Sequence, residues 1–545
     1  MEDLILVVGG GTMGAGIAFV AARAGYSVEL VEPDPASVER AVARIRSDAQ
    51  RAGDESIVAR VSLRETIPQR THASIAIEAV PERLDLKRTV FAALERALDP
   101  AALLATNTSS LSVGELAQDC EFPQRVIGLH FFNPPAVMKL VEIVAAERTS
   151  DETLARGREF VERIGKIGAE CADTPGFIVN RVARPFYLQA MRALERGVAS
   201  IEELDALARG AGFRMGPFEL MDLIGIDVNL AVSESVYERL EAERLAPRAM
   251  QRELVAQNRL GRKTGSGFYT YDDGRYARLE LSVEPREDAE VLEEFVAVIG
   301  FGAAADALAG ALGACCERVQ RVENDDLLDH LDPEATLVVD AGSGFEDRSD
   351  VIVELDRRLD PATIIFADAY TTDISALAPR LRHAERVVGF GILGDLESQS
   401  AIEVVDAPAS GDEALALAQE IFEAMGKPVV LVEDRPGLFL GRVVGSIVNE
   451  AMLAVAEDVA LPDDVDRAMQ YGVNYPRGPI AWGREIGGRR ITRILKRLAL
   501  AEGEAFAPHR SLWVLDEPPD DEERALEGIE EAAAGPRNSL GIEPR

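Results

Sequence analysis

The chain has 545 residues, of which 47% are hydrophobic and 28% are charged, and this composition is typical of a globular protein with several hydrophobic cores. Its length excludes a single small module and predicts about three or four domains, or one repeated unit. Asp and Glu number 94 against 58 Lys and Arg, which gives a formal net charge of -36. Because nucleic acid would be repelled over most of such a surface, we expect no nucleic-acid partner.

Neither the apolar runs nor the cysteines indicate a membrane segment or a metal site. Residues 1–3 carry no basic region, and no uncharged run reaches the roughly 18 apolar residues of a membrane-spanning helix. We therefore expect a soluble, cytoplasmic protein without a membrane partner. The four cysteines form neither a CxxC pair nor a metal-ligand spacing, so we expect buried thiols and no bound metal. They are Cys120, Cys171, Cys315 and Cys316.

The first 32 residues predict the start of an α/β domain. The apolar run 4–8 is typical of a strand that is covered on both faces, and it leads into the glycine-rich segment 9–16. A helical pattern follows, and then a second strand, 27–32, that ends in the acid Glu32. Strand, glycines, helix, strand and acid in this order are the fingerprint of a dinucleotide-binding Rossmann domain.

Each residue of the glycine-rich loop has its own expected task. Gly9 permits a tight turn, Gly11 lets the backbone approach a pyrophosphate, and Gly14 lets the helix pack on the strand. Thr12 and Met13 lie where the helix begins, and its N-terminus offers unpaired N–H groups and the positive end of the helix dipole. The loop is therefore a predicted cofactor site.

The acid at the end of the second strand indicates which dinucleotide binds. Glu32 would accept hydrogen bonds from the adenosine ribose hydroxyls. No Arg follows it directly in Pro33-Asp34-Pro35, so the 2′-phosphate of NADP would meet a like charge. The sequence therefore predicts NAD as the cofactor.

Several further runs place polar residues at strand ends. The runs 74–82 and 103–110 read as strand ends that deliver polar residues to the sheet edge where α/β proteins bind ligands. Residues 126–135 contain His130 within GLHFFNP, and the strand-like run 140–144 contains Glu142. A carboxylate between apolar neighbours is costly to bury alone, and His130 is its obvious partner.

Motifs along residues 1 to about 272 resemble those of the L-3-hydroxyacyl-CoA dehydrogenase family, in the family's order. They are GGGTMGAG, EAVPERLDLK, NTSS, GLHFFNP, VEIV, TPGFIVNR, MGPFELMDLIG and GRKTGSGFY. The resemblance implies NAD-dependent oxidation of an (S)-3-hydroxyacyl-CoA to the 3-oxoacyl-CoA by hydride transfer. It also implies an all-helical domain at 186–275 that closes over the acyl chain and carries a dimer contact.

The resemblance assigns roles to four catalytic residues. His130 would be the base that takes the hydroxyl proton, as suits an imidazole near neutral pH, and Glu142 would orient it. Ser109 and Asn180 would hold the substrate oxygen. Ser109 and Asn180 could instead only cap helices, and an isolated His could be a satisfied core residue.

The resemblance also assigns the surroundings of the ribose and the nicotinamide. The matching positions are Glu82, Lys87, Asn107, Ser109, Asn133 and Lys263. Lys87 could equally be a solvated helix residue. Where the family contacts CoA phosphates, Arg40, Arg44 and Arg51 share one helix face, and they either bind phosphate or form an exposed face.

The second half of the chain repeats the first. An offset of 261 aligns the halves without a gap from 98–100 to residue 181, and a strand-turn start recurs at 296–305 with Ala305 in place of Gly14. The offset replaces functional residues of the first copy as follows: His130 by Gly391, Ser109 by Tyr370, Asn133 by Gly394 and Asn180 by Gly441. Only Glu142 persists, as Glu403, so we expect neither this reaction nor cofactor binding in the second copy.

The predicted fold is α/β, a Rossmann-type doubly wound sheet plus an all-helical domain, with the pair repeated as a degenerate second copy. The predicted domains are an NAD-binding Rossmann domain (1–185), a helical substrate and dimerisation domain (186–275), a linker (276–292), a degenerate Rossmann-like domain (293–440), a second helical domain (441–515) and an acidic disordered tail (516–545). Gly216-Pro217 recurs as Gly478-Pro479. We therefore predict an intramolecular pseudo-dimer, with a homodimer of whole chains also possible.

Two other functions stay open at this point. One is an NAD-dependent dehydrogenase of a free 3-hydroxy acid, which would use a Lys base, and the other is a non-catalytic NAD-binding sensor or scaffold. The two-copy layout is similar to that of family members that act on 3-hydroxybutyryl-CoA and on 3-hydroxyadipyl-CoA, in fatty acid or phenylacetate breakdown. The sequence does not rank these two acyl-CoA substrates.

Overall fold

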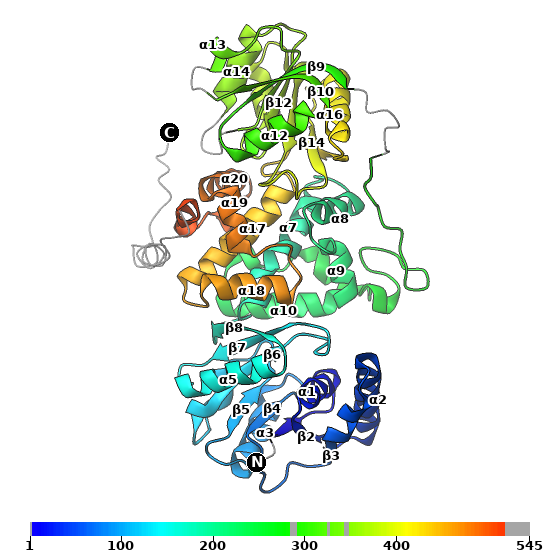
Figure 1. Ribbon diagram of the computed structural model, residues 1–545, viewed down its shortest axis with the longest axis vertical. Coiled ribbons are helices and arrows are strands. Elements are labelled where there is room, and N and C mark those ends of the chain that lie inside the picture. Colours follow the sequence, from blue (N-terminus) through cyan, green and yellow to red (C-terminus); the bar gives the residue numbers. More distant parts are fainter. Residues whose placement is uncertain (1–2, 284–290, 324–326, 343–347, 518–545) are drawn as a thin grey trace. The chain divides into compact units, whose positions relative to one another are not determined.

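The computed structural model describes residues 3–283, 291–323, 327–342 and 348–517 (Figure 1). The described residues form two compact units. The first unit comprises the described residues of 1–183, 238–241 and 457–478, and the second comprises those of 184–237, 242–456 and 479–545. The predicted linker lies partly outside the described residues, and so does the predicted acidic tail from residue 518 onward.

The first unit contains an eight-stranded sheet in the order β3-β2-β1-β4-β5-β6-β7-β8. Its strands are β1 (Leu4–Val8), β2 (Ser27–Val31), β3 (Val61–Arg64), β4 (Ile75–Glu78), β5 (Leu103–Thr106), β6 (Val126–Phe131), β7 (Leu140–Ala145) and β8 (Ile167–Ala172). β6 and β7 are antiparallel, and the other neighbouring pairs are parallel. The short apolar runs become central strands because they are buried on both faces.

Helices cover both faces of this sheet. They are α1 (Thr12–Arg23), α2 (Pro35–Ala52), α3 (Leu84–Ala97), α4 (Val113–Ala117), α5 (Asp151–Arg163) and α6 (Val179–Val182). α1, α2 and α5 share one hydrophobic core with the sheet, while α3 contacts β4 and β5 and α4 contacts β6. The same unit also includes α18 (Pro462–Gly472), which packs on β7, β8 and α6.

The second unit contains a seven-stranded sheet in the order β10-β9-β11-β12-β13-β14-β15. Its strands are β9 (Leu292–Ile299), β10 (Cys316–Val322), β11 (Leu337–Asp340), β12 (Ile364–Asp368), β13 (Val387–Gly391), β14 (Ile402–Asp406) and β15 (Val429–Glu433). The order repeats that of the first sheet without a counterpart of β3 in the described residues, and β13 and β14 are again antiparallel. The accompanying helices are α12 (Ala303–Gly313), α13 (Leu327–His330), α14 (Ser349–Arg358), α15 (Ile374–Leu377) and α16 (Asp412–Ala424).

The rest of the second unit is helical. Its helices are α7 (Arg184–Glu195), α8 (Ile201–Gly210), α9 (Pro217–Ile224), α10 (Ile226–Leu240, of which the last turn belongs to the first unit), α11 (Ala249–Ala256), α17 (Leu440–Ala456), α19 (Pro479–Ile486) and α20 (Gly488–Glu502). α7 packs on α17, which is buried along nearly its whole length. The predicted α/β architecture, a Rossmann-type sheet plus a helical domain present twice, is confirmed.

The repeated Gly-Pro motif has the same structural cause in both copies. Asp205 accepts hydrogen bonds from the N–H groups of Phe218 (2.9 Å) and Glu219 (2.8 Å) at the start of α9. A Cβ atom at Gly216 would overlap the Asp205 carboxyl, and one at Gly478 would overlap that of Asp466. In the first copy, Gly216 therefore lets Asp205 reach the N-terminus of α9.

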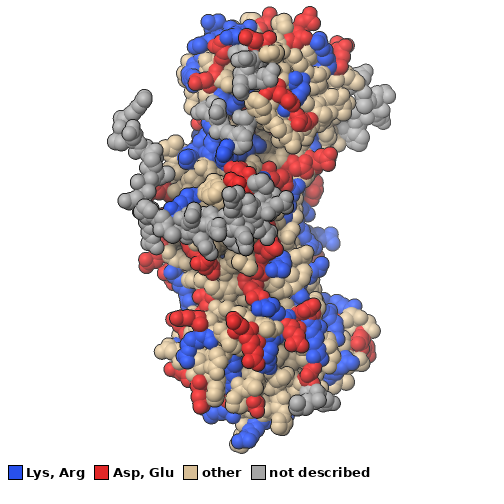
Figure 2. Space-filling model, turned by 60° about the vertical axis from the view of Figure 1, so that its left-hand side comes forward, with Lys and Arg blue, Asp and Glu red and all other residues tan. Residues whose placement is uncertain are grey.

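Charged side chains cover the surface (Figure 2), and the helices lack a membrane span within the described residues. Acidic and basic side chains are interspersed over the face that Figure 2 shows. Among the described residues, no helix is long and apolar enough to cross a membrane.

Candidate functional site

The glycine-rich loop leaves an open space at the start of α1. Gly9 has a φ of +109°, and a Cβ there would lie 2.5 Å from the carbonyl oxygen of Ala79. A Cβ at Gly14 would overlap the carbonyl of Gly9, whereas one at Gly11 would meet no atom within 4 Å. No side chain caps the N-terminus of α1. This open space and the uncapped N–H groups fit the pyrophosphate of a dinucleotide.

Glu32 follows β2 directly and lies beside this loop. Its Oε2 accepts a hydrogen bond from Gly10 N (2.7 Å), and its Oε1 accepts one from Asp34 N (3.0 Å). The backbone therefore fixes the carboxylate next to the glycine loop, where it fits the ribose hydroxyls of the same dinucleotide. Thr12 is exposed, and Met13 packs against the core of the sheet.

His130 and Glu142 form a buried pair on neighbouring strands. The antiparallel register of β6 and β7 places the two residues opposite each other. His130 Nδ1 lies 2.6 Å from Glu142 Oε2, and the exposed fractions of the two residues are 6% and 0%. The histidine is therefore held by a carboxylate, as predicted, and is not an isolated core residue.

The other oxygen of Glu142 binds backbone. Glu142 Oε1 accepts hydrogen bonds from Ile178 N (3.0 Å) and Val179 N (2.8 Å), at the start of α6. The imidazole also lies against aromatic rings, with centroid distances of 4.6 Å to Phe132 and 5.8 Å to Phe177. Both partners of the pair are thus fixed in orientation by their surroundings.

Ser109 and Asn180 come together beside this pair. Asn180, within α6, donates from Nδ2 to the carbonyl oxygen of Ser109 (3.3 Å). The cap residues of α4 and α6 are Ser112 and Ile178, so the alternative that Ser109 and Asn180 only cap helices is wrong.

Glu82 organises the segment that contains Ser109. Its Oε1 accepts hydrogen bonds from the Thr108 hydroxyl (2.6 Å) and from the N–H groups of Ser109 (2.9 Å) and Ser110 (3.0 Å). Burial would raise the pKa of Glu82, but the charge of Lys87 and these hydrogen bonds lower it to about 2. The carboxylate is therefore ionised at neutral pH.

Lys87 is buried beneath this segment, with an exposed fraction of 1%, so its interpretation as a solvated helix residue is wrong. Its ammonium lies 2.8 Å and 2.9 Å from the two oxygens of Glu78, 3.3 Å from the Val80 carbonyl and 3.1 Å from Glu82 Oε2. The sequence reasoning missed Glu78. Its signal is an acid that directly ends a fully apolar strand.

The other predicted cofactor residues have different surroundings. Asn107 Oδ1 accepts a hydrogen bond from Phe131 N (2.8 Å) and so joins the ends of β5 and β6. Asn133 is exposed just after β6. Lys263 belongs to the second unit, where its ammonium pairs with Asp227.

The three arginines that the resemblance relates to CoA phosphates lie on α2. Arg40, Arg44 and Arg51 are exposed on α2, and Arg40 and Arg51 contact acids or hydroxyls of their own helix or its cap.

In the part of the chain that the structure describes, no group of three or more His, Cys, Asp or Glu side chains could hold a metal ion.

A pocket of about 430 Å³ opens next to the Ser109 segment. Apart from Leu111 and Pro175, its lining is polar: Ser110, Ser112, Glu115, Asp173, Thr174 and Arg239. The Asp173 carboxylate already accepts hydrogen bonds from the Ser112 hydroxyl (2.6 Å) and from the N–H groups of Val113 (2.9 Å) and Gly114 (2.8 Å). The pocket therefore offers both polar and apolar surface to a ligand.

In the second copy, Tyr370 fills the position of the catalytic residues. Its hydroxyl donates to Glu403 Oε2 (2.5 Å), and Glu403 Oε1 accepts a hydrogen bond from Phe439 N (2.7 Å). A Cβ atom would lie 2.9 Å from the Tyr370 ring at Gly391 and 2.8 Å from it at Gly441. The two glycines that replace His130 and Asn180 thus make room for this one ring.

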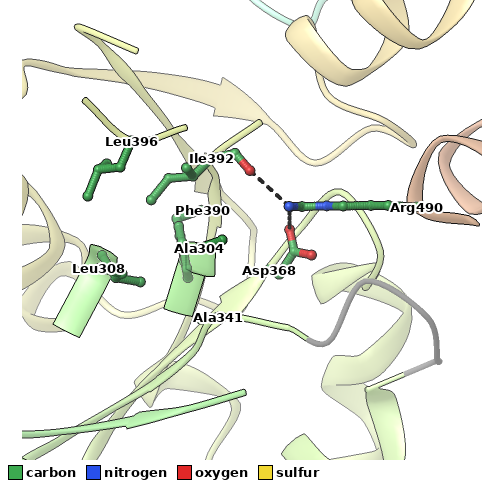
Figure 3. Close-up of a pocket in the computed structure, with 8 residues that line it drawn as sticks. All are labelled: Ala304, Leu308, Ala341, Asp368, Phe390, Ile392, Leu396 and Arg490. Atoms are coloured by element: carbon green, nitrogen blue, oxygen red, sulfur yellow. Dashed lines mark hydrogen bonds and ion pairs between the residues drawn. The ribbon is translucent and has the colours of Figure 1, made fainter. Parts of the chain in front are cut away.

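A small cavity lies beside the strand ends of the second sheet. A cavity of only about 20 Å³ lies between α12, the ends of the strands and Arg490, and its residues appear in Figure 3. Arg490 binds Asp368 (3.2 Å), the counterpart of Asn107, and the carbonyl oxygen of Ile392 (2.9 Å). Apolar side chains of Leu308, Phe390 and Leu396 line the rest. Arg490 and these apolar side chains thus enclose the cavity.

Comparisons with known proteins cover both copies. Models for the NAD-binding domain of 3-hydroxyacyl-CoA dehydrogenase match residues 4–174 and 295–435, and models for the C-terminal domain match 176–271 and 437–528. The chain is 37% identical over 511 residues to the 3-hydroxyadipyl-CoA dehydrogenase of Escherichia coli K12, which covers 92% of this chain and 94% of that protein.

Two further relatives differ in length. The chain is 37% identical over 279 residues to the probable 3-hydroxybutyryl-CoA dehydrogenase of Bacillus subtilis 168, and the match covers 49% of this chain and 97% of that protein. The crystal structure of a 3-hydroxybutyryl-CoA dehydrogenase from Escherichia coli K12 superposes with a TM-score of 0.75 at 34% identity, over 97% of this chain and 99% of that one.

Proposed function

The chain belongs to the 3-hydroxyacyl-CoA dehydrogenase family, and from this premise we propose how its first copy performs the NAD-dependent oxidation of a 3-hydroxyacyl-CoA. The reaction removes a proton from the C3 hydroxyl and a hydride from C3 itself. NAD, when bound, accepts the hydride. The observation that carries the proposal is the buried His130–Glu142 pair beside Ser109 and Asn180.

In this mechanism His130 is the base. Its Nδ1–H donates to Glu142, which leaves Nε2 to take the proton of the substrate hydroxyl. The imidazolium that forms is stabilised by the Glu142 carboxylate. Because two backbone N–H groups bind the other oxygen of Glu142, the carboxylate keeps its orientation while the charge develops.

The neighbouring polar residues hold the substrate and the cofactor. The Ser109 hydroxyl and the Asn180 amide bind the substrate oxygen as its bonding changes. Gly9, Gly11, Gly14 and the start of α1 hold the pyrophosphate, and Glu32 holds the ribose. Lys87 acts through Glu82, because its ammonium already contacts two carboxylates and a carbonyl oxygen, so it is a positioning residue.

The contacts of the Lys87 ammonium also argue against the alternative function, in which a lysine base would oxidise a free 3-hydroxy acid. The buried lysine of the first unit is held by Glu78, Val80 and Glu82 and is not available to take a proton. His130 is the group with a free ring nitrogen and a carboxylate partner. This comparison supports the acyl-CoA reaction.

We also propose that the two copies form an intramolecular pseudo-dimer. In the first unit, Ala172 N donates to the Val459 carbonyl (2.8 Å). In the second unit, Glu433 N donates to the Val198 carbonyl (2.9 Å). With the offset of 261, Ala172 corresponds to Glu433 and Val198 corresponds to Val459. Each sheet is therefore bound by the helical domain of the opposite copy. Such reciprocity is the property of an isologous dimer interface.

The test of the function is an assay of NAD reduction by absorbance. The substrates are 3-hydroxyacyl-CoAs of graded length together with 3-hydroxyadipyl-CoA, because the pocket beside Ser110 offers both polar and apolar surface and the relatives are named for both substrate types. A free 3-hydroxy acid is the negative control.

We predict that His130→Ala abolishes turnover of the best substrate. The variant lacks the base but keeps the glycine loop and Glu32, so its affinity for NAD, followed by fluorescence titration, stays within about twofold of the wild type. A His130→Ala variant that keeps more than about a tenth of the wild-type kcat would contradict the role of His130.

A further inference from the structure

α18 lies in the second copy of the sequence but packs in the first unit, against β7, β8 and α6 (Figure 1). Several polar contacts hold it there. Glu170 N donates to Asp464 Oδ1 (3.1 Å), and the buried Arg181 pairs with Glu457 (2.7 Å), just before the helix. Since Arg181 follows Asn180 directly, this segment is anchored next to the catalytic residues.

Gly472 is the last residue of α18, and it lies against residues that neighbour the catalytic pair. A Cβ atom at this position would lie 2.7 Å from Leu140 Cδ2, 3.0 Å from Val179 Cγ2 and 3.6 Å from Phe132 Cζ. The backbone of Gly472 does not have a positive φ. Glycine is therefore needed here for space and not for its conformational freedom.

Each of these three neighbours contacts His130 or Glu142 or lies on the same strand as one of them. Val179 donates its N–H to Glu142 Oε1 at 2.8 Å, and the Phe132 ring lies 4.6 Å from the imidazole. Leu140 is on β7, two residues before Glu142. A side chain at position 472 would push on Leu140 and Val179, whereas Phe132 would stay at an ordinary contact distance. Close-packed interiors transmit such displacements.

We propose that α18 of the second copy, through the close contact at Gly472, positions the His130–Glu142 pair of the first copy. Gly472 is a positioning residue and touches neither substrate nor cofactor. The second copy thus has a task in the reaction although its own catalytic position is filled by Tyr370. This assignment rests on the function proposed above for His130 and Glu142.

The duplication supplies a matched control at Gly210, the last residue of α8. A Cβ atom there would lie 2.8 Å from the Cβ of Ala401, which is the counterpart of Leu140 in the second sheet. Ala401 has no flexible end that could move aside, so Gly210→Ala disturbs the packing at least as much as Gly472→Ala. It does so next to the filled site of the second copy, where no reaction is expected.

The experiment compares Gly472→Ala, Gly472→Val and Gly210→Ala in the full-length protein. We expect Gly472→Ala to lower kcat about tenfold and Gly472→Val to lower it further, because small displacements of catalytic groups have large effects on rate. KM for the acyl-CoA and the affinity for NAD stay within about twofold. Gly210→Ala keeps kcat within about twofold, although its unfolding temperature falls at least as far.

Two outcomes overturn the proposal. One is that Gly472→Ala keeps its kcat, and the other is that Gly210→Ala loses kcat to the same extent, which would mean that both glycines affect only folding. If Gly472→Ala folds poorly, Gly472→Ala with Leu140→Ala removes the closest contact and should recover most of the lost kcat. A double variant no better than the single one also overturns it. A wild-type protein without turnover of any 3-hydroxyacyl-CoA rejects the proposed function itself, and this assignment with it.

Discussion

Glu142 uses its two oxygens for two different purposes. One oxygen lies 2.6 Å from the imidazole, and the other accepts hydrogen bonds from two backbone N–H groups. Glu403 divides its oxygens in the same way, with the Tyr370 hydroxyl in place of the imidazole. The acid therefore has a structural reason to persist in both copies. Its presence in the second copy is not a sign of activity there.

At this scale we predict that Glu142→Gln lowers kcat by about 10²- to 10⁴-fold, since an amide cannot stabilise the imidazolium and can favour the wrong tautomer. The matched control is Glu403→Gln, which changes the equivalent residue of the second copy and should leave kcat within about twofold. Steady-state kinetics of NAD reduction measure both variants. Equal losses of kcat in the two variants would show that the second copy takes part in the chemistry.

At the scale of elements, β14 contains a buried acid, Glu403, that forms no ion pair within the described part of the chain. Burial raises the pKa of Glu403 to about 7, and the hydrogen bonds from Tyr370, Phe439 and Leu440 offset this effect only in part. The unfolded chain releases the proton of Glu403 near pH 4.5, whereas the folded protein keeps it until about pH 7. This group therefore contributes stability that is complete below pH 4.5 and lost as the pH rises to 7.

Glu403→Gln removes this pH dependence, because its amide stays neutral. We predict that the free energy of unfolding of the variant, relative to that of the wild type, rises by about 2.5 kcal/mol between about pH 5 and about pH 8. Urea denaturation at the two pH values measures it. Glu413→Gln, at an exposed acid of α16, is the control and should show no such rise. A constant difference between Glu403→Gln and the wild type would mean that Glu403 is ionised in the folded protein throughout.

At the scale of the whole molecule, the pseudo-dimer predicts how the first copy behaves alone. A fragment of residues 1–285 lacks α18, so its β7 and β8 lose the helix that packs on them. We expect two fragments to associate, with α8 of each in the place of α18, because α8 is its counterpart in the repeat. Size-exclusion chromatography and activity at several protein concentrations measure this. A monomeric fragment with full activity and undiminished stability would refute the pseudo-dimer.

Sequence reasoning predicted the features that depend on local order. The duplicated α/β architecture follows from the motifs and the offset of 261. The His130–Glu142 pair follows from the family resemblance and from the cost of burying Glu142 without a partner. The Lys87–Glu78 contact was missed, because the ends of β4 and α3 approach each other only through the loop between them. Periodicity does not report such side-chain convergence.

The second copy shows another limit of sequence reasoning. Alignment of the repeats shows that His130 and Asn180 became glycines, which indicates a loss. The structure shows that the loss of these two side chains accompanies the presence of a tyrosine ring at position 370, which fills the space at both glycines. Likewise, contacts such as Glu170 with Asp464 span almost 300 residues. Neither the volume of a neighbouring side chain nor a partner so far along the chain can be read from a local pattern.

The reciprocal backbone contacts of Ala172 with Val459 and of Glu433 with Val198 occur within a single chain. In an association of separate subunits, such contacts form only when the protein concentration exceeds the dissociation constant. A covalent connection replaces that requirement with a fixed effective concentration, which the length of the linker determines. The support that α18 gives to the first sheet is therefore independent of dilution. The two halves are also free to diverge, because a substitution in one is not copied into the other.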